Sequence, residues 1–198
     1  MELVIATRNQ DKLLEIKELF LSAGLDNISF FGPENFPGYP EVIENGKTQR
    51  ENALKKARAG RDFTGKATLA EDSGLEVQAL GGAPGVYSAR FAGKGCVYRD
   101  NNLKLLAMME KFENRKAMFR CVAAIAFPNG DERVVEGTVD GCISRELLGE
   151  AGFGYDPLFI PSGYDKTFGQ LGLRVKQKIS HRTHAILAAI QVLKNVRV

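Results

Sequence analysis

Thr7, Asn9 and Lys12 form a polar group near the N-terminus that is suited to binding phosphate. They lie in a loop that follows the apolar run Leu3 to Ala6 and precedes a helical pattern. A strand that leads into a helix leaves backbone N–H groups free at the positive end of the helix dipole, where phosphates bind. Hydroxyl, amide and ammonium side chains add donors to such a site. The loop therefore predicts a phosphate site, and the alternative interpretation is a capped helix with an exposed lysine.

Glu71 and Asp72 are adjacent carboxylates that follow a short apolar stretch, Ala67 to Ala70. We expect a strand over that stretch and a backbone turn at Gly74, because neighbouring side chains of an extended strand point to opposite faces. Carboxylate oxygens are ligands that Mg²⁺ prefers, and this ion shares its other positions with water and substrate phosphates. The pair predicts a magnesium site, and the alternative is a solvated turn. A further carboxylate could come from an earlier segment, which holds Glu41, Glu44 and Glu51.

Phe153 lies between two glycines in the segment Gly152 to Pro157. Glycines leave the backbone open, so the ring could stack on a planar ligand, whereas the alternative is packing in the core. Donor-rich side chains that suit a carbonyl or phosphate oxygen follow at Lys176, His181 and Arg182. Phosphate donors, a carboxylate set, a stacking ring and a donor cluster are together what a Mg²⁺-dependent enzyme acting on nucleoside polyphosphates needs.

Common nucleotide-binding and hydrolase motifs are absent from the sequence. It contains no G-x-x-x-x-G-K-[ST] phosphate loop, no G-x-S-x-G and no H-E-x-x-H. His181 and His184 are three residues apart, but without a third ligand nearby this spacing is more typical of a helix surface than of a metal site.

The elements that must position these residues alternate between strands and helices. Helical patterns are expected over residues 13–23, 48–63, 101–112 and 180–194. The first has an apolar face and a polar face, and we assign Glu15, Lys17 and Glu18 to the polar one. The second begins with Thr48 to Glu51, which fits a capping box.

Two longer strands are expected in the second half of the chain. Ala117 to Phe127 is apolar at both sets of alternating positions apart from Arg120, which is typical of a central strand. Asn129-Gly130 predicts a hairpin turn with positive φ values, and Glu132 to Ile143 is the returning strand. We expect a mixed α/β fold, a single domain over residues 1–198 with two lobes around a central nucleotide-binding cleft.

Composition indicates a globular protein, with 44% hydrophobic and 26% charged residues in a chain of 198. The cysteines Cys96, Cys121 and Cys142 are odd in number and lack C-x-x-C spacing, which disfavours a disulfide framework and suits a reducing compartment. The apolar run at the N-terminus is too short for a signal peptide, and no run approaches a membrane span. We therefore expect a cytoplasmic protein with no membrane partner.

Charge is uneven along the chain, although the net charge is only +3. Every charged residue from Lys166 to Val198 is basic, and such a segment can bind either nucleic acid or a small polyphosphate. These basic residues are interspersed with glycine and apolar residues rather than forming a block, so we expect no nucleic-acid polymer as partner. A nucleotide-binding regulator that does not hydrolyse its ligand is the other alternative.

The chain closely resembles a known family over nearly its full length. The motifs that carry the resemblance are Thr7 to Lys12, Glu51 to Ala53, Glu71 to Leu75, Leu80 to Arg90, Gly152 to Pro157 and Ile179 to Arg182. In this order they are similar to the noncanonical purine nucleoside triphosphate pyrophosphatases, the inosine/xanthosine triphosphatase family. The resemblance implies hydrolysis of ITP, dITP and XTP to the monophosphate and pyrophosphate, with Mg²⁺ as cofactor and usually a homodimer.

The resemblance also implies roles for residues of the metal and phosphate site. The residues that would hold the phosphates are Thr7, Arg8, Asn9, Gln10, Asp11, Lys12 and Lys56. Glu44 and Asp72 would bind the metal, with Glu71 close by, and Asp72 would accept a proton from the attacking water. Arg8 stands where the family often carries glycine, so it could add a phosphate contact or narrow the loop. Glu41 competes with Glu44 for the metal.

The remaining roles concern the substrate and its base. By the same resemblance, Ser73 would contact the substrate and Phe153 would stack on the purine, with Gly154, Tyr155 and Asp156 around it. Lys176, His181 and Arg182 would read the purine edge. Donors such as Arg182 would satisfy the O6 acceptor of hypoxanthine or xanthine, whereas the amino group of adenine would leave two donors facing each other.

Overall fold

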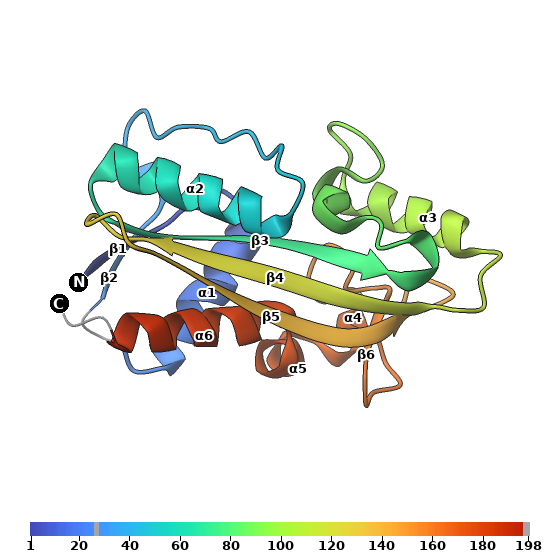
Figure 1. Ribbon diagram of the computed structural model, residues 1–198. Coiled ribbons are helices and arrows are strands. Elements are labelled where there is room, and N and C mark those ends of the chain that lie inside the picture. The colour runs from blue at the N-terminus through green and yellow to red at the C-terminus, as the bar shows by residue number, and fades with distance from the viewer. Residues whose placement is uncertain (26–27, 196–198) are drawn as a thin grey trace. The chain divides into compact units, whose positions relative to one another are not determined.

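The computed structural model describes residues 1–25 and 28–195 of the chain. Six strands form one sheet in the order β2-β1-β3-β4-β5-β6 (Figure 1). The strands are β1 (Glu2–Ile5), β2 (Ser29–Phe31), β3 (Ala67–Val77), β4 (Lys116–Ala126), β5 (Glu132–Ile143) and β6 (Phe159–Pro161). β1 pairs in parallel with both β2 and β3, whereas β5 and β6 are antiparallel. The predicted mixed α/β class is confirmed.

The helices connect these strands and follow β6. They are α1 (Gln10–Ser22), α2 (Gln49–Thr64), α3 (Tyr98–Met109), α4 (Phe168–Leu171), α5 (Leu173–Ile179) and α6 (His181–Asn195). Short 3₁₀ turns occupy Pro33–Asn35, Gln78–Leu80 and Gly85–Arg90. No helix among the described residues is long and apolar enough to cross a membrane.

Backbone contacts divide the chain into two compact units. The first unit consists of Met1–Asp72, Cys121–Gly137 and Arg182–Val198, and the second of Ser73–Arg120 and Thr138–His181. Each unit is described by itself below. The predicted single domain with a cleft between two lobes stays a prediction.

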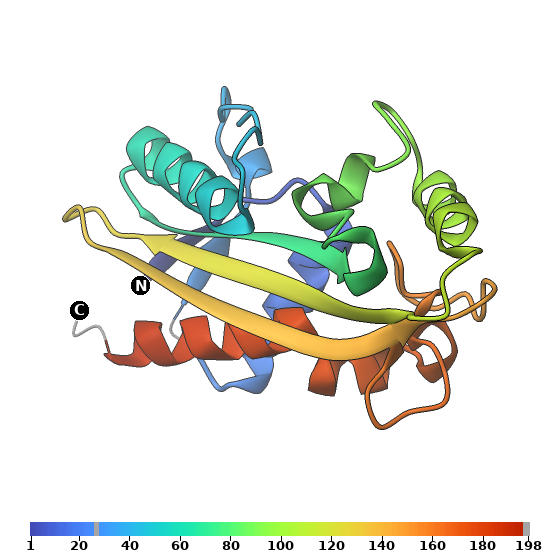
Figure 2. The same ribbon diagram turned by 45° about the vertical axis from the view of Figure 1, so that its right-hand side comes forward.

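The first unit has a hydrophobic cluster on each face of its part of the sheet. Figures 1 and 2 show α2 over one face and α1 and α6 over the other. Along β4, Cys121, Ala123 and Ile125 belong to the cluster with α1 and α6, whereas Val122 and Ala124 belong to the cluster with α2. Successive side chains of a strand point to opposite faces, and here both faces are covered. The predicted two-sided apolar character of this strand is confirmed.

The second unit has its own core, built largely from aromatic rings. The rings of Phe119 and Phe159 have centroids 4.6 Å apart, and those of Phe159 and Phe168 are 5.6 Å apart. Leu105 and Met109 of α3 pack in the same cluster and are fully buried. The core therefore joins α3 to the chain that follows β5.

Strand β3 differs from its predicted form. The expected turn at Gly74 is wrong, because β3 continues from Ala67 to Val77 without interruption. Gly74 is not among the glycines with positive φ. Pairing with β1 ends at Leu69, so burial of most of its side chains and hydrogen bonding to the neighbouring β4 keep the strand extended through its two carboxylates.

Smaller differences occur at element ends. Thr48 caps α2 by accepting a hydrogen bond from the Glu51 N–H, but the Glu51 carboxylate accepts from the Lys47 N–H, so only half of the capping box forms. In the β4–β5 hairpin, Gly130 has positive φ (92°), whereas no non-glycine residue does, so the expectation for Asn129 is wrong. In this loop Gly130 alone supplies a positive φ, whereas the expected turn needs a positive φ at both Asn129 and Gly130.

The close approach of α2 to β3 generates a stability prediction at Gly60. A Cβ atom there would lie 2.4 Å from the Tyr39 hydroxyl and 2.6 Å from Cγ2 of Thr68. We expect Gly60→Ala to lower the melting temperature, because overpacking costs about 1–3 kcal/mol. That cost exceeds the gain in helix propensity of about 1 kcal/mol. Thermal unfolding by circular dichroism measures the change, and a raised melting temperature would contradict the packing argument.

Tyr39→Phe is the matched variant for this test. The Tyr39 hydroxyl is buried with no hydrogen-bond partner among the described residues. Removing it should therefore leave stability unchanged or higher. The double variant Gly60→Ala/Tyr39→Phe should recover part of the loss, since one of the two clashing groups is gone.

Candidate active site

The two adjacent carboxylates of β3 point to opposite faces of the sheet in the first unit. Ala67 and Leu69 belong to the cluster beneath α1 and α6, and Ala70 belongs to the cluster beneath α2. By the same alternation, Glu71 faces α1 and α6 whereas Asp72 faces α2. Their hydrogen-bond and ion-pair partners, described next, agree with this division.

Glu71 is held between two cations. Its Oε1 lies 2.7 Å from Nζ of Lys12 and 3.6 Å from Nη2 of Arg182. The Cys121 thiol donates to its other oxygen at 3.3 Å. Burial alone would raise the pKa of Glu71, but the charges of Lys12 and Arg182 dominate and hold that pKa well below its usual value. Glu71 is therefore a carboxylate that remains ionised.

Arg182 connects this pair to a second buried carboxylate. Its Nη1 donates to Oε2 of Glu15 at 2.5 Å, and the Arg182 side chain is only 2% exposed. Burial opposes its charge, but Glu71 and Glu15 raise the pKa of Arg182 further. The assignment of Glu15 to a solvent-facing side of the helix is wrong, because Glu15 is buried, on the same side of α1 as Lys12 one turn earlier. Two cations and two carboxylates here balance in charge.

Asp72 has a different environment beside α2. Its Oδ2 accepts a hydrogen bond from Nδ2 of Asn52 at 3.0 Å, and Asn52 is itself fixed by the Gly46 N–H at 2.8 Å. Nζ of Lys56 lies 3.8 Å from Oδ1 of Asp72 and 2.8 Å from Oε1 of Glu44. Burial raises the pKa of Asp72, although Lys56 and Lys12 oppose the shift. Asp72 is thus a more basic carboxylate than Glu71.

The geometry distinguishes between the candidate metal ligands. Glu44 and Asp72 approach the same ammonium group, to which the backbone carbonyl of Glu71 also accepts a hydrogen bond at 2.8 Å. Glu41 is exposed, and the Glu51 carboxylate accepts a hydrogen bond from the Lys47 N–H instead. The Glu71 side chain lies on the other face and is paired with cations. Its backbone carbonyl lies beside Glu44 and Asp72, and its expected place near the metal stays a prediction.

The oxygen set around Lys56 fits Mg²⁺. It already surrounds a cation, and it consists of hard oxygen donors. Residues 1–25 and 28–195 contain no group of three or more His, Cys, Asp or Glu side chains arranged to hold a metal. Mg²⁺ commonly takes only one or two carboxylates and completes its shell with water and substrate phosphates. Two carboxylates at this place are therefore sufficient.

The predicted phosphate loop forms the start of α1. The Asn9 side chain accepts a hydrogen bond from the Lys12 N–H at 3.2 Å, and Oγ1 of Thr7 accepts from the Asn9 N–H at 3.2 Å. Gln10 and Asp11 are exposed in the first turn. Arg8 donates to the backbone carbonyl of Tyr39 at 3.0 Å, so its guanidinium ties the loop to the segment that leads to Glu44.

The second unit holds the predicted ring site. Oδ2 of Asp156 accepts hydrogen bonds from the Phe153 N–H at 2.9 Å and from Nζ of Lys176 at 2.6 Å. The same Lys176 ammonium lies 4.1 Å from the centroid of the Phe153 ring. Phe153 is half-buried, whereas Asp156 and Lys176 are 1% and 3% exposed. The loop thus presents one ring, backed by a buried ion pair.

Other predicted substrate residues have structural contacts. Tyr155 is buried in the core and donates its hydroxyl to the Ser88 carbonyl at 2.9 Å. Its ionisation is suppressed, because burial raises the pKa of this hydroxyl. His181 stacks on Phe119 with centroids 4.6 Å apart. Ser73 is half-buried within β3. The contacts of Arg182 belong to the first unit, and its expected contact with a purine edge stays a prediction.

Sequence reasoning missed Asn52, Glu15 and Cys121. Asn52 is fully buried inside α2, and an asparagine on the buried face of a helix was the available signal, since its side chain must find partners. Glu15 carried a similar signal, because it is adjacent to the apolar positions of α1. For the contact between Cys121 and Glu71 the sequence offered no signal, because a buried cysteine cannot be distinguished by sequence from an ordinary core residue.

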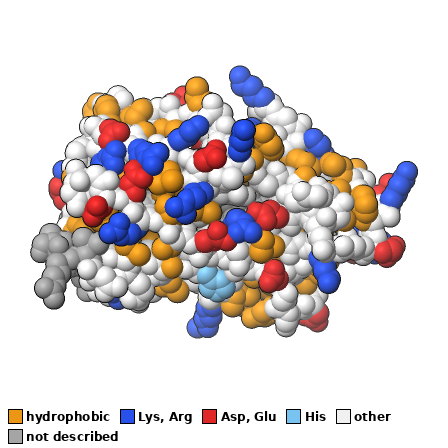
Figure 3. Space-filling model, in the orientation of Figure 1, with side chains coloured by type: hydrophobic (Ala, Val, Ile, Leu, Met, Phe, Trp, Pro, Cys, Tyr) orange, Lys and Arg blue, Asp and Glu red, His pale blue; other side chains and the backbone are white. Residues whose placement is uncertain are grey.

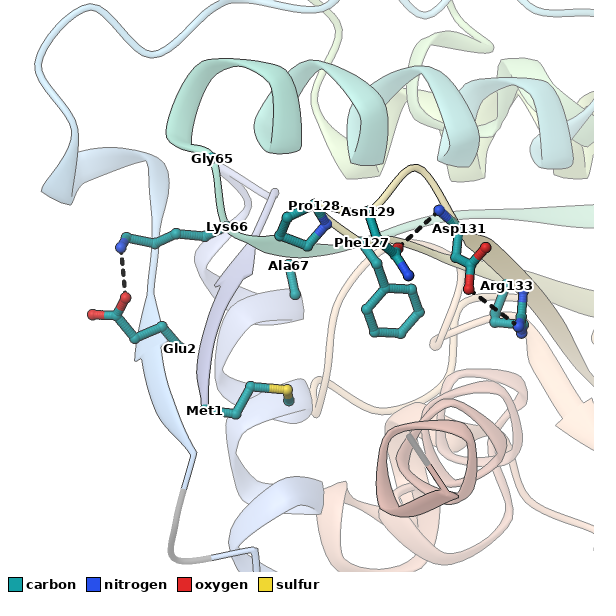
Figure 4. Close-up of a pocket in the computed structure, with 10 residues that line it drawn as sticks. All are labelled: Met1, Glu2, Gly65, Lys66, Ala67, Phe127, Pro128, Asn129, Asp131 and Arg133. Atoms are coloured by element: carbon teal, nitrogen blue, oxygen red, sulfur yellow. Dashed lines mark hydrogen bonds and ion pairs between the residues drawn. The ribbon is translucent and has the colours of Figure 1, made fainter. Parts of the chain in front are cut away.

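The first unit also has a pocket that lies apart from these residues. Figure 4 shows a pocket of about 480 Å³ in the first unit, where Met1, Ala67 and Phe127 provide apolar walls beside the Lys66–Glu2 ion pair. None of the predicted site residues lines it.

On the face shown in Figure 3, basic and acidic side chains are interspersed, so that face has no extended basic patch for a nucleic-acid polymer.

The buried ion pairs generate a prediction at Glu71. Glu71→Gln removes a charge that neutralises Lys12 and Arg182, and breaking a buried pair costs about 3–5 kcal/mol. We expect a loss of this size in the free energy of unfolding, measured with urea. The control is Glu113→Gln, which removes an exposed pair with Arg145 and should change stability by less than about 1 kcal/mol. Equal effects of the two substitutions would show that burial does not strengthen the pair.

Comparisons with known proteins agree with the fold. The model of the Ham1 family matches residues 3–192. The dITP/XTP pyrophosphatase of Desulforamulus reducens is 50% identical over 99% of this chain and 97% of its own length. The Ham1 protein structure from Staphylococcus aureus has a TM-score of 0.90 and 38% identity, with all of both chains covered. A HAM1 protein structure from Coxiella burnetii also has a TM-score of 0.90, at 38% identity over 99% of this chain and 100% of that one. This chain belongs to the Ham1 family.

Proposed function

We propose that this protein hydrolyses ITP, dITP and XTP to the nucleoside monophosphate and pyrophosphate, and so removes deaminated purines from the nucleotide pool. The observation that carries the proposal is the arrangement of Glu44, Asp72 and Lys56 around one position in the first unit. Two carboxylates and an ammonium group suit a metal-bound polyphosphate. Relatives named dITP/XTP pyrophosphatase support the choice of substrate.

The first unit would bind the phosphates and carry the reacting groups. Glu44 and Asp72 would hold Mg²⁺, which when bound neutralises phosphate charge and orients the attacking water. Lys12, Lys56 and the backbone N–H groups at the start of α1 would bind phosphate oxygens. Asn52 fixes Oδ2 of Asp72 and leaves Oδ1 available to accept a proton from water. A carboxylate with a raised pKa is the better base for this step.

The second unit would bind the base. The Phe153 ring would stack on the purine, and Lys176 beside it would offer a donor for the O6 oxygen of hypoxanthine or xanthine. Adenine presents an amino group at that position, so two donors would meet and remain unpaired. Unpaired buried donors reduce affinity strongly, which supports discrimination against ATP.

The resemblance to the family also supports a homodimer as the working form. The three cysteines are free rather than paired, which is consistent with a reducing compartment and supports a location in the cytoplasm. Sedimentation and fractionation test these two statements.

The experiment that tests the proposed function is pyrophosphate release from ITP, dITP, XTP, GTP and ATP, measured with Mg²⁺ and again with EDTA. We expect rapid, Mg²⁺-dependent release from the first three and little from ATP, since adenine lacks the O6 acceptor. Equal release from all five would remove the base-selectivity argument but leave the hydrolysis. Tight ITP binding without release would identify the protein as a nucleotide-binding regulator instead.

Two substitutions separate the two units' roles. Asp72→Asn removes the proton acceptor and keeps its shape, so we expect kcat for ITP to fall at least about a hundredfold while ITP still binds. Phe153→Ala removes stacking worth about 1–3 kcal/mol per base, so it should raise KM with little change in kcat. Steady-state kinetics and calorimetric ITP binding measure both. Near-normal turnover of Asp72→Asn, or an unchanged KM of Phe153→Ala, would refute the corresponding role.

A further inference from the structure

Asn102 of α3 makes a long-range hydrogen bond into the loop that carries Phe153. Its Nδ2 donates to the Gly154 carbonyl at 2.9 Å, although the two residues are 52 positions apart in sequence. The Asn102 side chain is 3% exposed, so water competes little for this bond. Gly154 directly follows Phe153, and its backbone has φ of 65°, in the left-handed region. The bond therefore fixes the loop at a point that sets the direction of the ring.

Tyr98 contacts the same loop from the same helix. Its ring centroid lies 5.9 Å from that of Phe153. Tyr98 and Asn102 are four residues apart, so they share a face of α3. One helix face thus contacts both the ring of Phe153 and the backbone carbonyl beside it.

The loop's own contacts do not replace this attachment. Asp156 accepts from the Phe153 N–H and its own N–H donates to the Phe153 carbonyl at 3.3 Å, which closes the turn on itself. Lys176 adds an ion pair at Asp156. The turn is thus closed on itself and attached to α5 at Asp156, whereas Asn102 attaches it to α3 at the carbonyl next to the ring.

Asn101, the preceding residue, holds a different loop. Its Oδ1 accepts from the Ala92 N–H at 2.7 Å and its Nδ2 donates to the Ala89 carbonyl at 3.2 Å. It is 2% exposed, almost the same as Asn102. Two neighbouring asparagines of equal burial therefore serve separate loops, and each is a control for the other.

We propose that Asn102 is a positioning residue that holds the Phe153 ring in the orientation needed to stack on the purine. The inference rests on the proposed function, because it assigns to Phe153 the binding of the base. Oδ1 of Asn102 is buried and has no hydrogen-bond partner among the described residues. Replacement by leucine removes this unpaired acceptor but also leaves the Gly154 carbonyl without its donor, so the two effects on stability oppose each other. Asn102→Leu should therefore fold while losing the attachment.

The kinetic test compares Asn102→Leu with Asn101→Leu, using ITP as substrate. Loss of one positioning hydrogen bond should raise KM about tenfold for Asn102→Leu, with kcat within about twofold, because stacking binds ground and transition states equally. Asn101→Leu should leave KM within about twofold. Melting temperatures of both variants identify any loss of folding. Asn102→Asp, which replaces the donor by an acceptor facing the Gly154 carbonyl, is the second variant and should raise KM at least as much.

A second readout needs no substrate. The chain has no tryptophan, so Phe153→Trp introduces a single fluorescent reporter at the ring position. Adding Asn102→Leu to that background should lower the fluorescence anisotropy and shift the emission to longer wavelength, whereas adding Asn101→Leu should not. An unchanged KM together with an unchanged tryptophan signal would overturn the positioning role.

The two readouts separate the two proposals. If the unmodified protein fails to hydrolyse ITP, the proposed function is wrong, and the tryptophan signal still decides whether Asn102 holds the ring. If ITP is hydrolysed but Asn101→Leu raises KM as much as Asn102→Leu, the effect is a general disturbance of α3 and the positioning role is overturned.

Discussion

The alternation of side chains along β3 is the constraint on which the first unit depends. It places two consecutive carboxylates on opposite faces of the sheet, so each must find its own partners. Glu71 meets Lys12 and Arg182 from α1 and α6, whereas Asp72 meets Asn52 and Lys56 from α2. Glu71 is thereby neutralised by fixed cations, whereas Asp72 is held by an amide and lies 3.8 Å from an ammonium group.

This division explains the opposite pKa shifts of two neighbouring residues. Both are removed from water, which alone would raise both pKa values. Glu71 has two cations against its carboxylate, so its pKa is lowered, whereas burial prevails at Asp72 and its pKa is raised. Since buried charges need partners, Glu15 completes the balance by pairing with Arg182. The ion pairs also fix Lys12 at the start of α1, where backbone N–H groups gather.

Prediction from sequence succeeded where the signal was local. The β4–β5 hairpin and the apolar faces of β4 both follow from periodicity and turn chemistry within a few residues. It failed at Gly74, where local propensity favoured a turn but burial and hydrogen bonding to β4 kept β3 extended. It failed again at Glu15, since a charged residue beside an apolar stripe is assigned to solvent unless its buried partner, more than 160 positions away, is known.

The sequence by itself determined the family, the mixed α/β class and the motifs that carry the candidate chemistry, because these depend on residue types and short spacings. Only the tertiary structure decided that Glu44 and Asp72 approach the same ammonium group of Lys56, and that Arg182 pairs with two buried carboxylates. Likewise, only the structure connected Asn102 to Gly154. The physical reason is the same in each case: a buried polar group is defined by partners that the fold brings from distant parts of the chain, and no local pattern encodes their distances.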